Sequence, residues 1–330
     1  MEIALPAILF AALALDSILG EPPVRIHPVC WTGTLAVKIE KMLRHGPNST
    51  AMFLRGLASC LLIIAIMLLG LSMSMALAES IFGAWGGYLV ALLCVYICMA
   101  PNCLAQNARS VALLLEKQDL PEARKAVGTI VGRKTDNLDQ YAVARACIES
   151  VAENLTDSTL ATLFWATVGL CFGGYTGCAM LVLLHRIANI LDAMWGKKND
   201  IYIRFGTAAA VLDDLLNYIP ARLSLPCIVL ATAICSCFVE GFNAKASWQM
   251  GWKYRRAHAS PNSAWSEAPF AGALGLQFGG VAEYTKLQVN HPLIGEGSPQ
   301  ATSEHIQRAI QLLFCTTLLF TVLATACSCL

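Results

Sequence analysis

The sequence predicts an all-α, polytopic integral membrane protein with additional juxtamembrane helices. Of its 330 residues, 56% are hydrophobic and only 14% are charged, and the mean hydropathy is +0.58. Soluble domains carry about 25% charged residues. All 23 lysines and arginines fall within four polar blocks, which are 20–55, 101–157, 185–222 and 240–308. This pattern excludes an ordinary cytosolic protein, a disordered chain and a secreted disulfide scaffold.

Three apolar segments are long enough to cross a membrane. Crossing the hydrocarbon core takes about 20 residues of helix, because backbone groups must pair internally there. The segments are Gly56–Ala78, Ile81–Ala100 and a stretch from about Ile310 to the C-terminus. Only Glu79 and Ser80 separate the first two, which predicts a tight helical hairpin.

Three further apolar segments are shorter or interrupted. Segment 159–184 contains four glycines, and 223–239 has Pro226 near its start. The first helix, Ile3–Leu19, is short and contains Asp16. No basic residue precedes it and no small-residue cleavage site follows it, so we expect it to be retained and not removed as a signal peptide.

The basic polar blocks predict the topology, because an excess of Lys and Arg marks the cytoplasmic side. All four blocks are basic, and they share one side only if 159–184 enters and leaves the membrane as a broken, re-entrant helix. We predict this arrangement for 159–184 and for 223–239. The protein is then a multi-pass protein of the cell (inner) membrane with some four to six membrane helices. Residues 1–330 form one domain, whose polar blocks meet in one site at the cytoplasmic face.

Metal sites built on cysteine and the common nucleotide motifs are not indicated. The 14 cysteines lie mostly in or beside apolar stretches, without C-x-x-C or zinc-type spacing, and are interpreted as small apolar residues. The sequence also has no P-loop, no G-x-G-x-x-G after a strand, no G-x-S-x-G and no H-E-x-x-H. A nucleotide site, if the protein has one, is therefore of another kind. The net charge of +1 gives no reason to expect a nucleic-acid partner.

The richest polar run is Gly132–Ser158. From about Gln140 it predicts a helix in which Glu149, Glu153 and Asp157 recur every four residues and so share one face. Arg145 precedes them by one turn on the same stripe. One interpretation of this stripe is a solvated helix face with intrahelical ion pairs. The other is a Mg²⁺ site beside the point where the chain enters the membrane, because Mg²⁺ prefers oxygen ligands.

A second run places His185, Asn189 and Asp192 on one side of a helix that ends near Gly196 and is followed by Lys197. This pattern fits a functional site and an ordinary amphipathic helix end equally well.

Two other runs carry carboxylates in apolar surroundings. Asp213 and Asp214 are adjacent, and adjacent like charges are costly unless a cation or base neutralises them, which favours a site. In the run His258–Gly280, Asn262 or Ser263 is expected to cap a helix whose first turns carry Glu267, and glycines 272, 275, 279 and 280 suit close helix packing.

Taken in order, the polar runs read LDSILGEPP, IHPVCWTG, GRKT, RACIESVAENLTDS, NILDAMWGKK, FGTAAAVLDDLLNYIPARL, SPNSAWSEAPFAGALGLQFGG and PLIG. This ordered set resembles the adenosylcobinamide-phosphate synthase family of cobalamin biosynthesis, membrane proteins of bacteria and archaea. The resemblance extends over nearly the whole chain, from Asp16 to Gly295.

The resemblance implies an amide-forming ligase. Its reaction is the ATP- and Mg²⁺-dependent condensation of adenosylcobyric acid with (R)-1-aminopropan-2-ol or its phosphate, which gives adenosylcobinamide or its phosphate. The implied cofactor is Mg²⁺, with ATP as cosubstrate. The implied partners are the corrinoid, the small aminoalcohol (phosphate) and membrane lipid, with no nucleic acid. Association with other enzymes of the cobalamin pathway is left open.

The matching residues can be assigned hypothetical roles on this basis. The candidate catalytic residues are Glu149, Glu153, Asp157, Asp192, Asp213 and Asp214. Among them, the candidate Mg²⁺ ligands are Glu149, Glu153, Asp157, Asp213 and Asp214. The candidate substrate-binding residues are Arg133, Arg145, Asn154, Asn189, Lys197, Asn217, Arg222, Asn262 and Glu267.

Departures from the family pattern support an alternative. Lys134 stands where the family has Asp, which reverses a charge beside Arg133. A catalytically degenerate paralogue with a regulatory or corrinoid-handling role is therefore the second reading, although the retention of six candidate carboxylates favours the enzyme. A transporter is a third reading, but the chain has few spans and no evident internal repeat.

Overall fold

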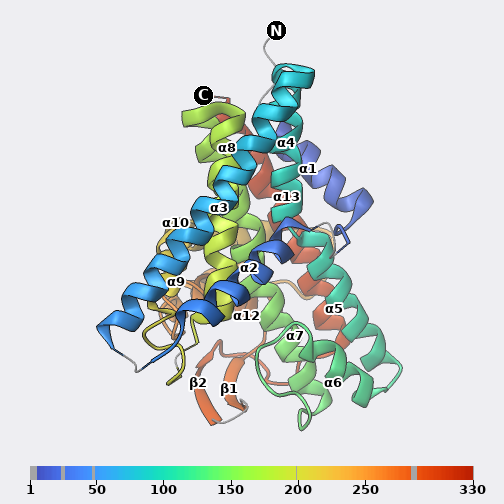
Figure 1. Cartoon of the computed structure of the whole chain (residues 1–330). Coiled ribbons are helices and arrows are strands. Elements are labelled where there is room, and N and C mark those ends of the chain that lie inside the picture. Colours follow the sequence, from blue (N-terminus) through green and yellow to red (C-terminus); the bar gives the residue numbers. More distant parts are fainter. Residues whose placement is uncertain (1–5, 24–26, 47–48, 198, 284–287, 330) are drawn as a thin grey trace. The chain divides into compact units, whose positions relative to one another are not determined.

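The computed structural model describes residues 6–23, 27–46, 49–197, 199–283 and 288–329 (Figure 1). Within these ranges the elements are helices apart from one two-stranded sheet, which confirms the predicted all-α class. The chain divides into two compact units, and its expected organisation as a single domain stays a prediction. Unit 1 comprises Met1–Ala100, Ala161–Asn217 and Thr321–Leu330, and unit 2 comprises Pro101–Leu160 and Tyr218–Phe320.

Five helical stretches of the described residues are long and apolar enough to cross a membrane, so the chain is a multi-pass membrane protein. They are Thr50–Phe82, Ala84–Glu116, Gln140–Trp195, Tyr218–Ser236 and Ser303–Ser328. The number agrees with the four to six spans expected from hydropathy. The inner-membrane location and the cytoplasmic orientation stay predictions.

Unit 1 is built from α1 (Ala7–Leu19), α2 (Pro28–Leu43), α3 (Thr50–Phe82), α4 (Ala84–Cys98), α8 (Ala161–Trp195) and α9 (Thr207–Leu216). Residues 3–5 of the predicted first helix lie outside the described residues. The expected α3–α4 hairpin is present (Figure 1), but it turns at Gly83 and not at Glu79 and Ser80. Gly83 has φ +61°, a left-handed conformation that favours glycine, so α3 continues to Phe82 before the chain reverses.

The glycine cluster breaks α8, as the sequence predicted. The backbone leaves helical geometry at Gly173 (φ −148°) and Gly174 (φ 58°), and the two halves of α8 then pack closely. A Cβ placed on Gly169 would lie 2.4 Å from the carbonyl oxygen of Gly177, and one on Gly177 would lie 2.6 Å from that of Gly169. These two glycines allow backbone-to-backbone contact. The re-entrant arrangement of this segment in a membrane stays a prediction.

The Glu40 carboxylate connects α2 to the C-terminal end of α8. Glu40 accepts hydrogen bonds from the Trp195 indole N–H (3.0 Å) and the Tyr202 hydroxyl (2.8 Å), and it pairs with Arg44. Trp195 also packs edge-to-face on Phe205, with ring centroids 5.0 Å apart and both side chains fully buried. This cluster orders the segment that leads from α8 into α9.

Unit 2 is built from α5 (Pro101–Glu116), α6 (Leu120–Gly128), α7 (Gln140–Asn154), the π-helical turn η2 (Leu155–Leu160), α10 (Tyr218–Ser236), α11 (Ala244–Tyr254), α12 (Ala264–Leu274), β1 (Phe278–Glu283), β2 (Gln288–Ile294) and most of α13 (Ser303–Ser328). The broken helix expected at 223–239 is not found. Helix α10 continues through Pro226, which lacks only one backbone donor and has no glycines beside it to release the backbone.

The β1–β2 pair was not expected, because the glycines after α12 suggested further helix packing. Gly272 does pack in a helix, against the backbone of Ala246, but Gly275 ends α12 in the left-handed conformation. Gly279 and Gly280, with φ of 86° and 90°, lie in β1 at an irregularity in its antiparallel pairing with β2. Glycines with positive φ favour a bulged strand over a helix.

The close contact inside α8 makes a prediction about stability. Replacing Gly169 with Leu should destabilise unit 1 by several kcal/mol, since the new side chain has no space against Gly177 and Cys178. The thermal unfolding midpoint in detergent would measure the loss. Gly70→Leu is the matched control, because Gly70 also lies in a candidate span and has nothing within 4 Å of its added Cβ. Equal midpoints for both variants would contradict the packing described here.

Candidate functional site

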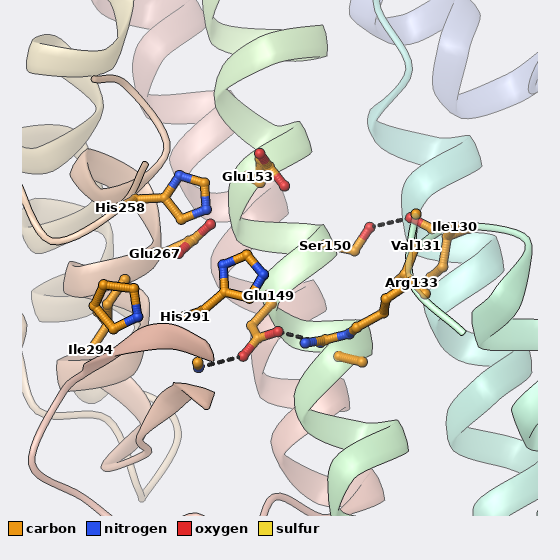
Figure 2. Close-up of a pocket in the computed structure, with 14 residues that line it drawn as sticks. Ile130, Val131, Arg133, Glu149, Ser150, Glu153, His258, Glu267, His291 and Ile294 are labelled. Carbon is orange, nitrogen blue, oxygen red and sulfur yellow. Dashed lines mark hydrogen bonds and ion pairs between the residues drawn. The ribbon is translucent and has the colours of Figure 1, made fainter. Parts of the chain in front are cut away.

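A pocket of about 150 Å³ lies in unit 2 and is lined by side chains from segments far apart in the sequence (Figure 2). The segment after α6 supplies Arg133, α7 supplies Glu149, Ser150 and Glu153, and α12 supplies Glu267. His258 comes from the loop between α11 and α12, and the β1–β2 pair contributes Gly279, His291, Pro292 and Ile294.

Helix α7 places two of the three predicted carboxylates, Glu149 and Glu153, in the pocket, whereas the third, Asp157, lies beyond the end of α7 in the π-helical turn η2 and does not line it. It begins at Gln140, where the Asp139 side chain accepts a hydrogen bond from the Ala142 N–H (2.7 Å) and so caps the helix. Glu149 and Glu153 are one turn apart and both line the pocket. Asn154, a predicted substrate residue, donates its side-chain N–H to the Ser150 carbonyl (2.9 Å), within its own helix.

Glu149 is fully paired. It forms an ion pair with Arg133, and each side chain is only 15% exposed. Its other carboxylate oxygen, Oε1, accepts the backbone N–H of Gly279 (2.8 Å). The same glycine passes so close to Pro292 that a Cβ would lie 2.2 Å from the Pro292 carbonyl oxygen. Arg145, expected on the same stripe, instead donates to the Pro299 carbonyl (2.9 Å).

Glu153 and Glu267 also line the pocket. The Ser263 hydroxyl donates to Glu153 Oε1 (3.0 Å), so the side chain of Ser263 does not cap α12 as the sequence suggested. Glu267 is 6% exposed. Burial, and then the neighbouring charges of Glu153 and Glu149, hold the pKa of Glu267 well above its ordinary value. This region therefore concentrates negative charge in a poorly solvated place.

Two pocket residues were missed by the sequence analysis. His258 and His291 stack with ring centroids 6.1 Å apart and planes at 8°, and both line the pocket. The sequence signal was their position, since His258 begins the polar run His258–Gly280 and His291 directly precedes PLIG. They come from a loop and a strand, and no periodic pattern relates two such residues before the fold is known.

Arg222 and Asn262 hold a loop beside the pocket. The Arg222 guanidinium donates to the Asn262 side-chain oxygen (2.7 Å) and to the Pro261 carbonyl (3.3 Å). It also lies over the rings of Tyr218 and Trp265, at 3.5 and 5.0 Å from their centroids. Such cation–π contacts favour a fixed guanidinium. In this arrangement both predicted substrate residues orient the loop that carries Ser263.

The other predicted residues form a second polar cluster in unit 1. Asp213 is 7% exposed and accepts side-chain amide N–H groups from Asn217 (3.0 Å) and Asn189 (3.4 Å). The Asn217 oxygen in turn lies 3.0 Å from the buried His185 ring nitrogen Nε2. Burial, followed by the charge of Asp192, raises the pKa of Asp213 to about 7.

Of the remaining candidates, Asp192 and Asp214 are half-buried, and Lys197 is exposed at the surface of unit 1. Asp157 is half-buried in η2 of unit 2, a π-helical turn of the kind often found at functional sites. The candidate residues therefore divide between a pocket in unit 2 and an amide-carboxylate cluster in unit 1.

The charges of the pocket fit a cation, although the described side chains do not form a complete metal cage. After burial, the negative charges of Glu153, Glu149 and Asp157 raise the pKa of Glu267, and the Arg133 guanidinium lowers it. Among the described residues, no group of three or more His, Cys, Asp or Glu converges as metal ligands. Mg²⁺ commonly uses only one or two carboxylates and takes its other ligands from water and phosphate.

Apolar helices long enough to span a membrane and a small carboxylate-lined pocket define a polytopic membrane protein with a candidate site in unit 2. The model of the family described as "CobD/Cbib protein" matches residues 9–313, and the chain belongs to this family.

Curated relatives are similar over almost their whole length. A protein from Citrobacter koseri named "Cobalamin biosynthesis protein CobD" is 35% identical, over 97% of this chain and 96% of the relative. One of the same name from Klebsiella pneumoniae is 36% identical, over 92% and 91%. "Cobalamin biosynthesis protein CbiB" from Salmonella typhimurium is 34% identical, over 96% of both chains. No solved structure matches. The comparisons confirm the expected connection with cobalamin biosynthesis.

The raised pKa of Asp213 makes a prediction about pH. The native state keeps the Asp213 proton up to about pH 7, whereas the unfolded chain releases it near its ordinary value of 3.8. Stability is therefore greatest below the unfolded pKa and is lost as pH rises through the native one. In chelator-containing detergent buffer, Asp213→Asn should reduce the fall of the thermal unfolding midpoint between about pH 5 and about pH 8, because Asn keeps the acceptor without the charge.

Asp136→Asn removes an exposed carboxylate and serves as the control for this experiment. Parallel pH profiles for the wild type and Asp213→Asn would contradict the assignment of this titration to Asp213.

Proposed function

We propose that this chain performs the amide-forming step of cobalamin biosynthesis. The reaction is the condensation of adenosylcobyric acid with (R)-1-aminopropan-2-ol or its phosphate, with consumption of ATP. The observation that carries the proposal is the convergence of four family motifs on one pocket. GRKT, RACIESVAENLTDS, SPNSAWSEAPFAGALGLQFGG and PLIG are separated in sequence, yet they supply Arg133, Glu149, Glu267 and Ile294 to the same lining.

The chemistry explains why such a site needs both carboxylates and cations. A carboxylate does not acylate an amine at neutral pH, because oxide is a poor leaving group. An oxygen of the corrinoid carboxylate first attacks the γ-phosphorus of ATP, which gives an acyl phosphate and ADP. The amine nitrogen then attacks the acyl carbon, phosphate leaves, and the nitrogen gives up its surplus protons to a base. When bound, Mg²⁺ would screen the charge on the phosphates.

The described residues offer candidates for these needs in each of the two units. Arg133 is held by Glu149, and its guanidinium can stabilise negative charge on a phosphoryl or carboxyl group. Glu153 and Asp157 are the candidates in this unit for holding Mg²⁺ or accepting a proton. In unit 1, the cluster of Asp213, Asn189 and Asn217 is the candidate for a second contribution, through a carboxylate already oriented by two amide donors.

The proposed partners follow from the family and the spans. The relatives are named for cobalamin biosynthesis, which supports a corrinoid as the large substrate. The apolar helices support contact with membrane lipid. The concentration of Lys and Arg in the polar blocks supports a cytoplasmic active site in the cell membrane, where ATP is available.

The alternative is a catalytically degenerate family member with a regulatory or corrinoid-handling role. It was suggested by Lys134 in place of the family's Asp. Lys134 is exposed and is not among the residues that line the pocket, while its backbone N–H donates to the Glu283 carbonyl (2.8 Å). Its position therefore gives no specific reason to prefer the alternative over the enzyme.

The direct test uses detergent-purified protein with adenosylcobyric acid, ATP, Mg²⁺ and either aminopropanol or its phosphate. We expect mass spectrometry to detect the amide product together with ADP, and both to require ATP and Mg²⁺. A verified relative assayed in parallel is the control. No product with any aminoalcohol, while the relative is active, would overturn the proposal and favour the degenerate paralogue.

Variants of two carboxylates test the assignment of catalytic residues. Glu153→Ala and Asp213→Ala should each abolish amide formation, because each removes a negative charge that the chemistry would use, without preventing membrane insertion. Product formation is followed by mass spectrometry and insertion by membrane fractionation. Glu122→Gln is the control, since Glu122 is an exposed partner of Lys125 outside both clusters. Full activity in both alanine variants would remove these residues from the mechanism.

A further inference from the structure

Glu267 differs from the other carboxylates of the pocket in having no hydrogen bond. Glu149 accepts from Arg133 and from the Gly279 N–H, and Glu153 accepts from Ser263. Within the described part of the chain, the Glu267 carboxyl has no such partner. Glu267 lines the pocket, and its exposed fraction is only 6%. Burying a carboxyl without partners costs several kcal/mol unless a ligand or a proton compensates it.

The charge of the pocket indicates the sign of that ligand. Arg133 and Glu149 neutralise one another as an ion pair. Glu153 and Glu267 remain, and they oppose each other electrostatically in a region of low solvent exposure. A positively charged group placed between them would relieve both the repulsion and the missing hydrogen bonds of Glu267.

The size and walls of the pocket indicate the class of cation. Its volume of about 150 Å³ is well below the roughly 300–1,000 Å³ of drug-sized ligand sites, so it matches a group smaller than a corrin ring or a whole nucleotide. The imidazoles of His258 and His291 and the apolar Ile294 and Ala146 are also part of the lining. A bare Mg²⁺ prefers oxygen ligands. Nitrogen and hydrocarbon walls suit a small organic cation better.

We propose that this pocket binds the primary ammonium group of a small amine between Glu153 and Glu267. An ammonium carries three N–H donors, and the two carboxylates can accept from it directly. Figure 2 shows Glu267 and Glu153 among the histidines, with Arg133 reaching the pocket from the other side of α7. The identity of the amine rests on the proposed function, which makes it the aminoalcohol, whereas the binding itself does not require catalysis.

The test measures equilibrium binding to the full-length, detergent-purified protein in the absence of corrinoid, ATP and Mg²⁺. The probes are 1-aminopropan-2-ol, its phosphate and propane-1,2-diol, in which a hydroxyl replaces the amine. At least one of the two amines should bind about tenfold or more tightly than the diol. Equal binding of amine and diol, or binding of neither amine, would overturn the proposal.

A pair of variants locates the binding. Glu267→Gln keeps the shape and removes the charge, so it should weaken amine binding by about tenfold or more. Glu296→Gln is the matched control, because Glu296 is an exposed carboxylate of the same unit that pairs with Lys253. Unchanged amine affinity in Glu267→Gln would count against the subsite, as would a Glu267-dependent affinity for Mg²⁺ without any for the amine.

The same measurements separate this proposal from the proposed function. Amine binding that depends on Glu267, with no amide product in the ligase assay, would leave the subsite standing and remove the ligase. An active ligase whose KM for the amine is unchanged in Glu267→Gln would support the proposed function and overturn the amine subsite.

Discussion

The site in unit 2 depends on the pairing of one half-buried carboxylate. Glu149 binds the Arg133 guanidinium and the Gly279 N–H at once, and so connects the segment after α6, the middle of α7 and strand β1. A half-satisfied charge at this depth would be strongly unfavourable, because desolvation is compensated only when the partners are complete. The glycine is needed as well, since a side chain at position 279 would collide with the Pro292 carbonyl and push β1 away from α7.

Features that follow local rules could be predicted from the sequence. The membrane helices, the break at Gly173 and Gly174, and the shared face of Glu149 and Glu153 each depend on composition or helical period. The β1–β2 pair could not be predicted, because its glycines suit a helix contact and a bulged strand equally well. His258 and His291 were missed for a related reason, since only tertiary structure brings a loop and a strand together.

Arg222 shows how a role predicted from sequence can leave out the packing of the side chain. Its charge and its place in a motif suggested phosphate or carboxylate binding. In the structure, its donors reach Asn262 and Pro261, and its flat face lies on Tyr218. An Arg that is fixed on an aromatic ring and a loop acts first as a positioning residue. Sequence reports the type of side chain available, whereas the direction of its donors depends on the packing around it.

Two buried carboxylates, one in each unit, illustrate how the surroundings distinguish structure from binding. Asp213 is buried, but the amides of Asn217 and Asn189 donate to it, so its oxygen is partly compensated within the protein. Glu267 has comparable burial and faces other carboxylates instead. A fold that buries a charge without a partner stores an unfavourable energy, which a complementary ligand can recover on binding. The primary ammonium of a small amine, as proposed above, is a complementary ligand of this kind, and its size matches a pocket of about 150 Å³.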